Sequence, residues 1–345
     1  MGERDHSSSA QNAARQQQQA SGQAPFTYSQ KTIQSGGVIH PAVDPAYGGK
    51  RFCKDVNGKA SSAFTFALDV TGSNIESAKI IWDMLPQLFA LVATQGWGGE
   101  HPNLQLAAVG DAFTDDYPFQ LTQFEPDGAT MDKWMSRIVL EGNGGGQQHE
   151  SYETMMWMLN NQNELDQWSR GEKGVLFILW DELPYETVRV DQLETVYAAG
   201  AAAPDSDVPL SAGQLVPSRN TMSLPTANIT LDDVARELNQ KYDVYTITCG
   251  ESYYWQGDHN ENENRWINLF GKERIFNLKD SHDIVGLIAA IIGQRAGVGK
   301  TQIAKSIKQL GLGDVDSIST ALARSTGTGI EATGEQTGSS KAKRI

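Results

Sequence analysis

The sequence has little cysteine, little positive charge and no long hydrophobic run. Cys53 and Cys249 are too few for a disulfide framework and are not spaced like zinc ligands. Basic residues number 28 against 42 acidic ones, a formal net charge of -14, which disfavours nucleic acid and anionic lipid as partners. No segment approaches an apolar membrane span, and residues 1–19 lack the apolar core of a secretory signal. We therefore expect a soluble, cytoplasmic protein that binds neither nucleic acid nor membranes.

The composition is sufficient for one large domain flanked by tails. The hydrophobic fraction is 39% and there are eight tryptophans, which can supply a sizeable core. Residues 1–50 are rich in Ser, Gln, Gly and Ala, which predicts a disordered N-terminal arm. A domain is expected over residues 60–295, a helical extension over 296–324 and a disordered tail over 325–345.

Between the tails, apolar runs of strand length alternate with helical patterns, which is typical of a parallel sheet covered by helices. Residues 63–69 (AFTFALD) predict a buried first strand, and 174–180 (GVLFILW), the most apolar run, a central one. Strands over 104–113 and 119–124 are joined by a short polar link, which favours an antiparallel hairpin. The expected fold is α/β: a Rossmann-like, doubly wound, mostly parallel six-stranded sheet with one antiparallel edge strand and helices on both faces. Further elements are predicted as helices over 75–93, 131–140, 150–159, about 230–242 and 284–292, and strands over 244–248 and 274–278.

Two insertions interrupt this pattern, over residues 198–225 and 250–264. Each follows the carboxyl end of a predicted strand. Ligands of doubly wound sheets bind at that edge, so these loops are expected to border any site there.

A group of oxygen-bearing side chains follows the first strand. Asp69 ends the strand, and Thr71 and Ser73 follow before a helix begins. Carboxylate and hydroxyl oxygens are the ligands of hard cations such as magnesium and manganese. The hydroxyls keep the charge of the site low, so a bound cation stays attractive to a carboxylate from outside.

The segment Phe66-Ala-Leu-Asp-Val-Thr-Gly-Ser73 resembles the first metal-site loop of von Willebrand factor A (VWA) domains, of the intracellular, bacterial or phage type. The resemblance spans roughly residues 60–295 and implies the VWA fold. It also implies a metal-ion-dependent adhesion site (MIDAS) holding Mg²⁺, or Mn²⁺ or Ca²⁺. In that family a third loop adds an Asp after the fourth strand, and Asp181 in Leu179-Trp-Asp-Glu matches it.

The second loop of the family is matched by Gly144-Gly-Gly-Gln-Gln-His-Glu150, which resembles a Gly-Gly-Gly-Asp-x-Pro-Glu form. The resemblance places Glu150 at the ligand position. The sequence departs from the form at Gln147, where the family has Asp, and at His149, where it has Pro. The implied metal ligands are therefore Asp69, Thr71, Ser73, Glu150 and Asp181.

The resemblance implies a function in adhesion or assembly and no enzymatic activity. The cation would keep one coordination position for a Glu or Asp of a partner protein. A second hypothesis is a structural component of a phage or bacterial assembly that uses the fold without metal, supported by the tails and the insertions.

Each site residue also has a purely structural interpretation. Asp69 is also compatible with an Asx turn before a helix, although the match of the third loop favours the metal, and Asp181 with a turn before Pro184. Glu150 fits the first turn of a helix. A second cation site at Asp111, Asp115 and Asp116 is less favoured than a solvated turn.

Two enzyme classes have weak support. Gly297-Val-Gly-Lys-Thr301 resembles a phosphate-binding loop around Lys300, but Gln294 stands where the pattern requires Gly, and the segment follows a predicted helix. A helix-ending glycine explains it better. A haloacid dehalogenase-like phosphotransferase would use Asp69 as nucleophile but needs an acid where Thr71 stands.

Overall fold

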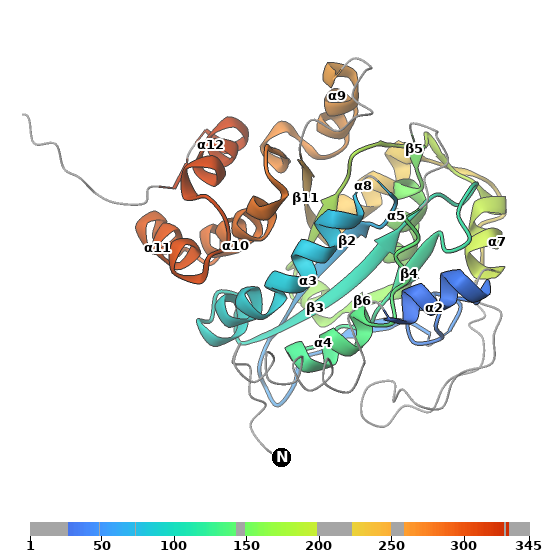
Figure 1. Cartoon of the computed structure of the whole chain (residues 1–345), viewed down its shortest axis with the longest axis horizontal. Coiled ribbons are helices and arrows are strands. Elements are labelled where there is room, and N and C mark those ends of the chain that lie inside the picture. Colours follow the sequence, from blue (N-terminus) through green and yellow to red (C-terminus); the bar gives the residue numbers. More distant parts are fainter. Residues whose placement is uncertain are drawn as a thin grey trace, which may run out of the picture.

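The computed structural model describes residues 27–47, 49–72, 74–142, 149–198, 223–249, 259–327 and 329–330. A six-stranded sheet in the order β12-β11-β7-β2-β3-β4 forms its centre (Figure 1). All neighbouring strands are parallel except β3 and β4, which are antiparallel. The predicted fold class, including the antiparallel edge, is confirmed. The strands are β2 (Ser61–Asp69), β3 (His101–Val109), β4 (Phe119–Leu121), β7 (Gly174–Leu179), β11 (Tyr242–Cys249) and β12 (Ile275–Leu278).

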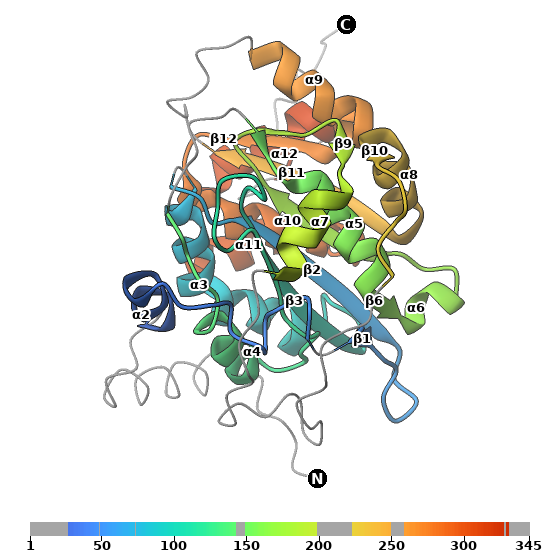
Figure 2. The same cartoon turned by 90° about the vertical axis from the view of Figure 1, so that its right-hand side faces the viewer.

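Both faces of the sheet are buried, because side chains of β2 alternate between two hydrophobic clusters. Phe64, Phe66 and Leu68 enter one cluster, whereas Ala63 and Ala67 enter the other. Helices cover the two faces, as Figures 1 and 2 show. The first cluster is covered by α3 (Ile75–Phe89), α4 (Gly128–Met135) and α10 (Ile284–Arg295), and the second by α5 (Tyr152–Gln162), α7 (Val190–Ala198), α8 (Leu231–Lys241) and α9 (His259–Phe270).

Local signals in the sequence set several helix boundaries. The hydroxyl of Thr230 accepts a hydrogen bond from the Asp233 backbone N–H and caps α8, as predicted. Helix α3 continues into the π-helical turn η1 (Ala90–Thr94). The two elements together cover the helix predicted over residues 75–93. Shorter elements complete the described chain: α2 (Thr27–Ser35), α6 (Asp166–Ser169), β1 (Arg51–Cys53) with β6 (Asn163–Leu165), β5 (His149–Glu150) with β8 (Leu183–Pro184), β9 (Thr187–Val188) with β10 (Ile229–Thr230), and the 3-10 turns η2 (Lys272–Arg274) and η3 (Ser281–Asp283).

The segment from residue 27 to 47 is packed against the domain, which corrects the expected arm over residues 1–50. Ile39 and Val43 are buried, and the hydroxyl of Ser29 donates to the Leu140 carbonyl. The buried Arg51 donates to the carbonyls of Asp44 and Tyr47. Long-range contacts hold this stretch although its composition is that of a loop; residues 1–26 lie outside the described ranges.

The predicted insertions fall mostly outside the described residues, which leave out 199–222 and 250–258. Helix α9 starts at His259, so the second insertion is helical over its last residues and not wholly a loop. No helix in the described ranges is long and apolar enough to cross a membrane.

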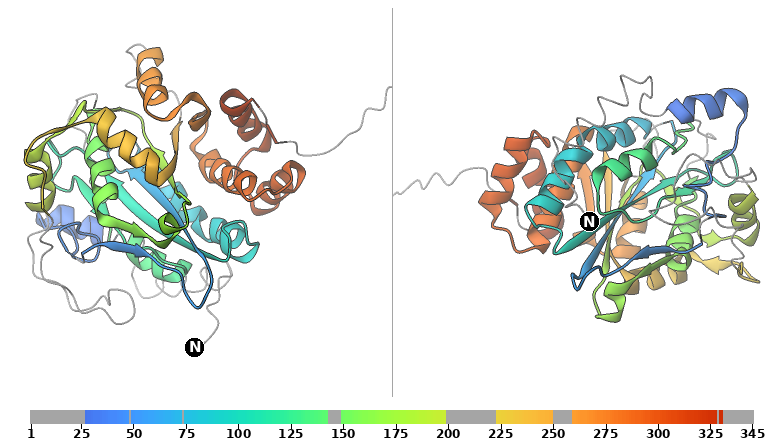
Figure 3. Two further views of the ribbon diagram at one scale, coloured as in Figure 1. Left: turned by 180° about the vertical axis from the view of Figure 1, so that it is seen from behind. Right: turned by 90° about the horizontal axis from the view of Figure 1, so that it is seen from below.

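The C-terminal helices α10, α11 (Lys300–Leu310) and α12 (Val315–Thr326) lie together at one side of the sheet (Figure 3). A Cβ added to Gly286 of α10 would lie 2.3 Å from the Leu312 carbonyl oxygen, so glycine permits this close packing. Gly297 has φ +73°, and the Val298 N–H donates to the Gly293 carbonyl. This pair ends α10 in the manner of a helix C-cap, and the segment around Lys300 joins two helices without the strand that a phosphate-binding loop needs.

Candidate metal centre

The register of the central strands brings the first and third predicted loops to one edge of the sheet. Leu68 of β2 pairs with Leu179 of β7. Asp69 comes one residue after Leu68, and Asp181 comes two residues after Leu179, so both acids lie just beyond the same edge of the sheet. Both side chains are buried, with 1% and 6% of their surface exposed. The carboxyl ends of parallel strands thus place two acids where the sequence predicted them.

The first loop holds the Asp69 carboxylate from two sides. Its Oδ1 accepts from the Thr71 backbone N–H at 2.9 Å and from the Thr71 hydroxyl at 2.5 Å. Its Oδ2 accepts from the Tyr152 hydroxyl at 2.6 Å. The Asx turn therefore exists, and it also fixes the Thr71 hydroxyl proton on Asp69. The lone pairs of that hydroxyl oxygen remain available to a cation.

The first loop contacts the start of the second. The Gly142 N–H donates to the Val70 carbonyl at 3.3 Å, and a Cβ on Gly72 would lie 2.9 Å from the Gly142 carbonyl oxygen. The approach of the two backbones therefore requires glycine at position 72. Ser73 and residues 143–148, which include Gln147, lie outside the described residues.

The second and third loops are joined by a short parallel pair of strands. Glu150 of β5 pairs with Pro184 of β8, so Glu150 lies beside the loop that carries Asp181. Glu150 is 3% exposed, and its Oε2 accepts no hydrogen bond from the described part of the chain. The first-turn interpretation of Glu150 is wrong, because α5 begins only at Tyr152. Buried polar atoms usually have a hydrogen-bond partner, so this oxygen is a candidate contact for a bound cation or water.

The Tyr152 hydroxyl interacts electrostatically with an acid of each of the three loops. Its pKa is raised well above the usual value, first by burial and then by the charges of Asp69, Asp181 and Glu150. Tyr152 lies edge-on to Trp266, with ring centroids 5.4 Å apart, and Trp266 packs on Trp180 at 5.0 Å. Tyr152, which donates to Asp69, is therefore part of an aromatic layer with Trp266 and Trp180.

Further acids surround this group. Asp111 and Asp115 are buried acids in the turn that follows β3, and Glu182 follows Asp181. Burial, followed by neighbouring carboxylates, raises the pKa of Glu182 to about 7; burial also raises that of Asp115 to about 6, against a smaller lowering by a backbone hydrogen bond. The pKa of Glu150 is likewise raised, first by burial and then by Asp69.

The expectation of a solvated turn at Asp111 is wrong. The Tyr185 hydroxyl and the Thr114 hydroxyl donate to Asp111 Oδ2, and the Phe113 N–H donates to Oδ1. The Asp111 N–H in turn donates to Asp115. The turn is internally bonded, so its acids are structural parts of the edge.

The donor set fits a hard divalent cation. Asp69, Thr71, Glu150 and Asp181 offer only oxygen atoms, the preference of Mg²⁺, Mn²⁺ and Ca²⁺. Among the described residues, no lysine or arginine forms an ion pair with Asp69, Glu150 or Glu182. No three His, Cys, Asp or Glu side chains of the described chain are grouped closely enough to hold a metal alone. An ion here would rely on the Thr71 hydroxyl and on water as well as on carboxylates.

Sequence reasoning missed Tyr152 and Glu182 as members of this edge. Glu182 was adjacent to Asp181 and acidic, which is a usable signal. Tyr152 had none, because its bond to Asp69 joins residues 83 positions apart.

Neither a protein-family profile nor a curated protein matches the chain. Among solved structures, it is similar to the pilus adhesin SpaC from Lactobacillus rhamnosus GG, with 9% identity and a TM-score of 0.44 over 75% of this chain and 31% of that one. It is similar to the vWF domain of the type V pili tip protein Mfa5 from Porphyromonas gingivalis, with 13% identity and a TM-score of 0.40 over 74% and 97%. Proximal thread matrix protein 1 from the mussel byssus, with a zinc-occupied MIDAS motif, gives 9% identity and 0.39 over 72% and 50%.

These likenesses concern the fold alone, and the chain spans less than a third of the length of SpaC. The fold assignment rests on the strand order and on the helices of both faces, which define a doubly wound, Rossmann-type α/β domain.

Proposed function

We propose that this chain is a metal-dependent binding module that joins a partner protein in adhesion or assembly. Asp69, Thr71, Glu150 and Asp181 would hold a divalent cation, with Ser73 as a further predicted ligand. A Glu or Asp carboxylate of the partner would complete the coordination. The observation that carries the proposal is the buried Glu150 Oε2, which has no hydrogen-bond partner among the described residues, at an edge where three acid-bearing loops meet.

The charge of the edge supports this proposal. Buried carboxylates without a basic partner destabilise a fold unless a proton or a cation neutralises them. A divalent cation would supply that neutralisation and attract an acid from outside. Asp69 would orient Thr71 through the hydrogen bond that it accepts, and Tyr152 would hold Asp69 in place.

The module would act by binding and not by catalysis. Asp69 has no acid at Thr71 to assist it as a nucleophile, and Lys300 lies at the start of α11 between helices. Magnesium is the expected cation, with manganese and calcium as alternatives. A cytoplasmic location belongs to the proposal, and the thiols of Cys53 and Cys249 are free.

Calorimetric titration with Mg²⁺ and Mn²⁺ tests the proposal. The wild-type chain is expected to bind one ion, and Asp69→Ala is expected to weaken binding at least about 100-fold. Asp55→Ala, an acid at the opposite end of β2, is the matched control and should bind as the wild type does. Absence of binding, or equal binding by Asp69→Ala, would refute the proposal.

A second candidate is a structural component that uses the fold without metal. It is favoured by the Asp69 carboxylate, both of whose oxygens already accept hydrogen bonds from Thr71 and Tyr152. Size-exclusion chromatography of a partner complex separates the two functions. EDTA should dissociate a metal-dependent complex and leave a metal-free assembly intact.

A further inference from the structure

Three rings form a continuous ladder on the loops that carry the candidate site. His149, next to Glu150, stacks on Tyr185 with ring centroids 5.1 Å apart and an interplanar angle of 22°. Tyr185 meets Phe113 edge-on, with centroids 5.0 Å apart. The ladder thus joins the second loop, the third loop and the turn after β3.

The ladder is fixed in place by polar contacts below it. The Tyr185 hydroxyl donates to Asp111 at 3.2 Å, and the Tyr185 N–H donates to the buried carboxylate of Glu153 at 3.0 Å. The Arg189 guanidinium lies over the Phe113 ring at 5.1 Å from its centroid. A partner that docks here would therefore find rings whose positions are already set, which reduces the entropy lost on binding.

Phe113, at the outer end of the ladder, is exposed to solvent. It is 43% exposed, the highest value among the exposed large hydrophobic side chains of the described residues. An aromatic ring that is rigid and exposed beside a buried charged site is typical of the contacts that dominate protein–protein binding energy.

The charges around the ladder limit the kind of partner segment. Asp115 and Glu182 lie near the site, and Asp116 is exposed on the Phe113 turn. A segment with several acids would be repelled by these carboxylates, whereas one acid could be neutralised at the cation. The edge therefore fits a single carboxylate next to an apolar side chain.

We infer that His149, Tyr185 and Phe113 form the specificity surface of the module, which recognises a protein segment with one Glu or Asp next to an aromatic or large aliphatic residue. The acid binds the cation, and the neighbouring side chain packs on Phe113. This inference rests on the proposed function for the cation and adds the identity of the flanking residue.

Selection from a random peptide library displayed on phage tests the inference. The wild-type chain is loaded with Mg²⁺, and bound phage are eluted with EDTA. Enriched peptides are expected to carry one acid beside Phe, Trp, Tyr or Leu. For a synthetic peptide of the enriched sequence, Phe113→Ser should weaken binding about tenfold.

Matched variants separate the ladder from general effects. Phe52→Ser makes the same change at a ring that is 37% exposed in β1, outside the ladder, and should leave peptide binding unchanged. Phe113→Trp should retain it. Mg²⁺ titration of each variant should be unaltered, because Phe113 offers no ligand to the cation.

The outcomes distinguish this inference from the proposed function. Enrichment of acids without apolar neighbours, equal peptide binding by Phe113→Ser, or no enrichment by a chain that binds Mg²⁺ would overturn the ladder alone. Failure to bind Mg²⁺, or peptide binding that survives both EDTA and Asp69→Ala, would overturn the metal-dependent function and the inference with it.

Discussion

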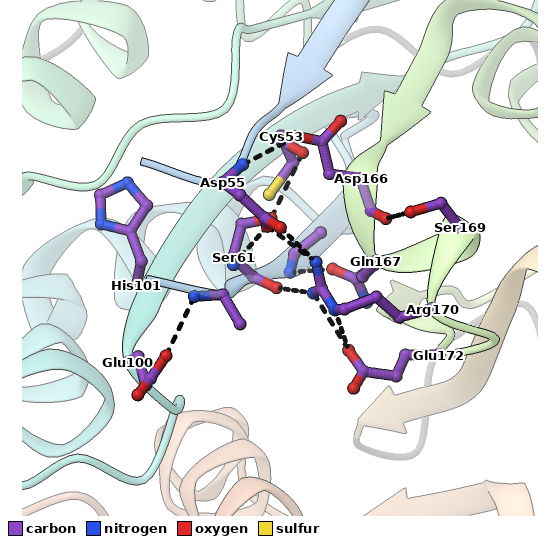
Figure 4. A network of polar contacts seen from close by, with 12 residues as sticks. Cys53, Asp55, Ser61, Glu100, His101, Asp166, Gln167, Ser169, Arg170 and Glu172 are labelled. Atoms are coloured by element: carbon purple, nitrogen blue, oxygen red, sulfur yellow. Dashed lines mark hydrogen bonds and ion pairs between the residues drawn. The ribbon is translucent and has the colours of Figure 1, made fainter. Parts of the chain in front are cut away.

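The two ends of strand β2 carry acids in opposite electrostatic settings. At the amino end, Arg170 donates to both oxygens of Asp55 at 2.8 and 2.7 Å and to the Ser61 carbonyl at 2.8 Å (Figure 4). At the carboxyl end, Asp69 and Glu150 have no basic partner among the described residues. Both oxygens of Asp55 accept hydrogen bonds at the amino end, whereas Glu150 Oε2 at the carboxyl end accepts none from the part of the chain that the structure describes.

The pKa values differ in the same way. Hydrogen bonds from Ser61 and then Arg170 lower the pKa of Asp55. At the other end, burial raises the pKa of Glu182 to about 7 and that of Glu153 to about 8. A charged carboxylate is thus stabilised at one end of the strand and destabilised at the other. The difference agrees with the proposal that the amino end holds the fold together and the carboxyl end binds a cation.

Cation binding should give the largest effect and should affect only the carboxyl end. At a thousand times its Kd, Mg²⁺ is expected to stabilise the fold by about 4.1 kcal/mol. Glu150→Gln should reduce this gain without lowering metal-free stability, because Oε2 has no hydrogen-bond partner in the described chain. Urea denaturation with Mg²⁺ and with EDTA measures both. Glu164→Gln, in β6, is the control; a gain unchanged in Glu150→Gln would contradict the role of Glu150.

The contact between the first two loops should be the next most sensitive feature. Gly72→Ala places a Cβ 2.9 Å from a backbone oxygen and is expected to cost ~1–3 kcal/mol and to weaken cation binding. In Gly299→Ala the added Cβ meets nothing within 4 Å, so cation binding should stay as in the wild type. Denaturation and calorimetry on both variants provide the comparison, and equal effects would show that the loops tolerate a side chain here.

The metal-free protein should lose stability as the pH rises from about 5 to about 8. The carboxyls of Asp115, Glu182 and Glu153 have pKa values of about 6, 7 and 8, above their unfolded values. The folded state therefore binds more protons over this range, and the free energy of unfolding falls with pH. Glu153→Gln should reduce the loss of the free energy of unfolding in the upper part of this pH range by on the order of 1 kcal/mol. Stability that is constant or rising over this range would contradict buried, uncompensated acids.

The amino end should respond least and with the opposite sign of pH dependence. Arg170→Met removes the ion pair with the exposed Asp55, so the stability loss should be small and should shrink at high salt. Because the pKa of Asp55 is lowered, its contribution exists above the unfolded value and is lost as the pH falls through the folded one. Mg²⁺ affinity should not change, as calorimetry can show; a change would mean that the two ends are coupled.

The sheet could be predicted from the sequence because strands are marked by patterns among residues that are close together in the chain. Buried runs such as 174–180 and the hairpin between β3 and β4 follow from apolar patterning and turn residues, and Asp69 follows its strand directly. Long-range contacts could not be read in this way. Examples are the packing of Ile39 and Val43 within a Ser- and Gln-rich segment, and the pairing of Glu150 with Pro184.

The candidate site was accessible from sequence only in part. The residue types and spacing of Asp69 and Thr71 predicted the first loop, and the resemblance to VWA domains assigned Glu150 and Asp181 to the second and third. The bond from Tyr152 to Asp69 and the burial of Asp111 depend on how distant loops meet, which no local pattern encodes.

A crystal structure of the chain grown with Mn²⁺, with anomalous scattering recorded for the metal, tests the central claim most directly. The account predicts one anomalous peak beside the Thr71 hydroxyl, between the loops that carry Asp69, Glu150 and Asp181. Crystals soaked in Mn²⁺ with no peak at this edge, or with the ion bound elsewhere on the chain, would contradict it.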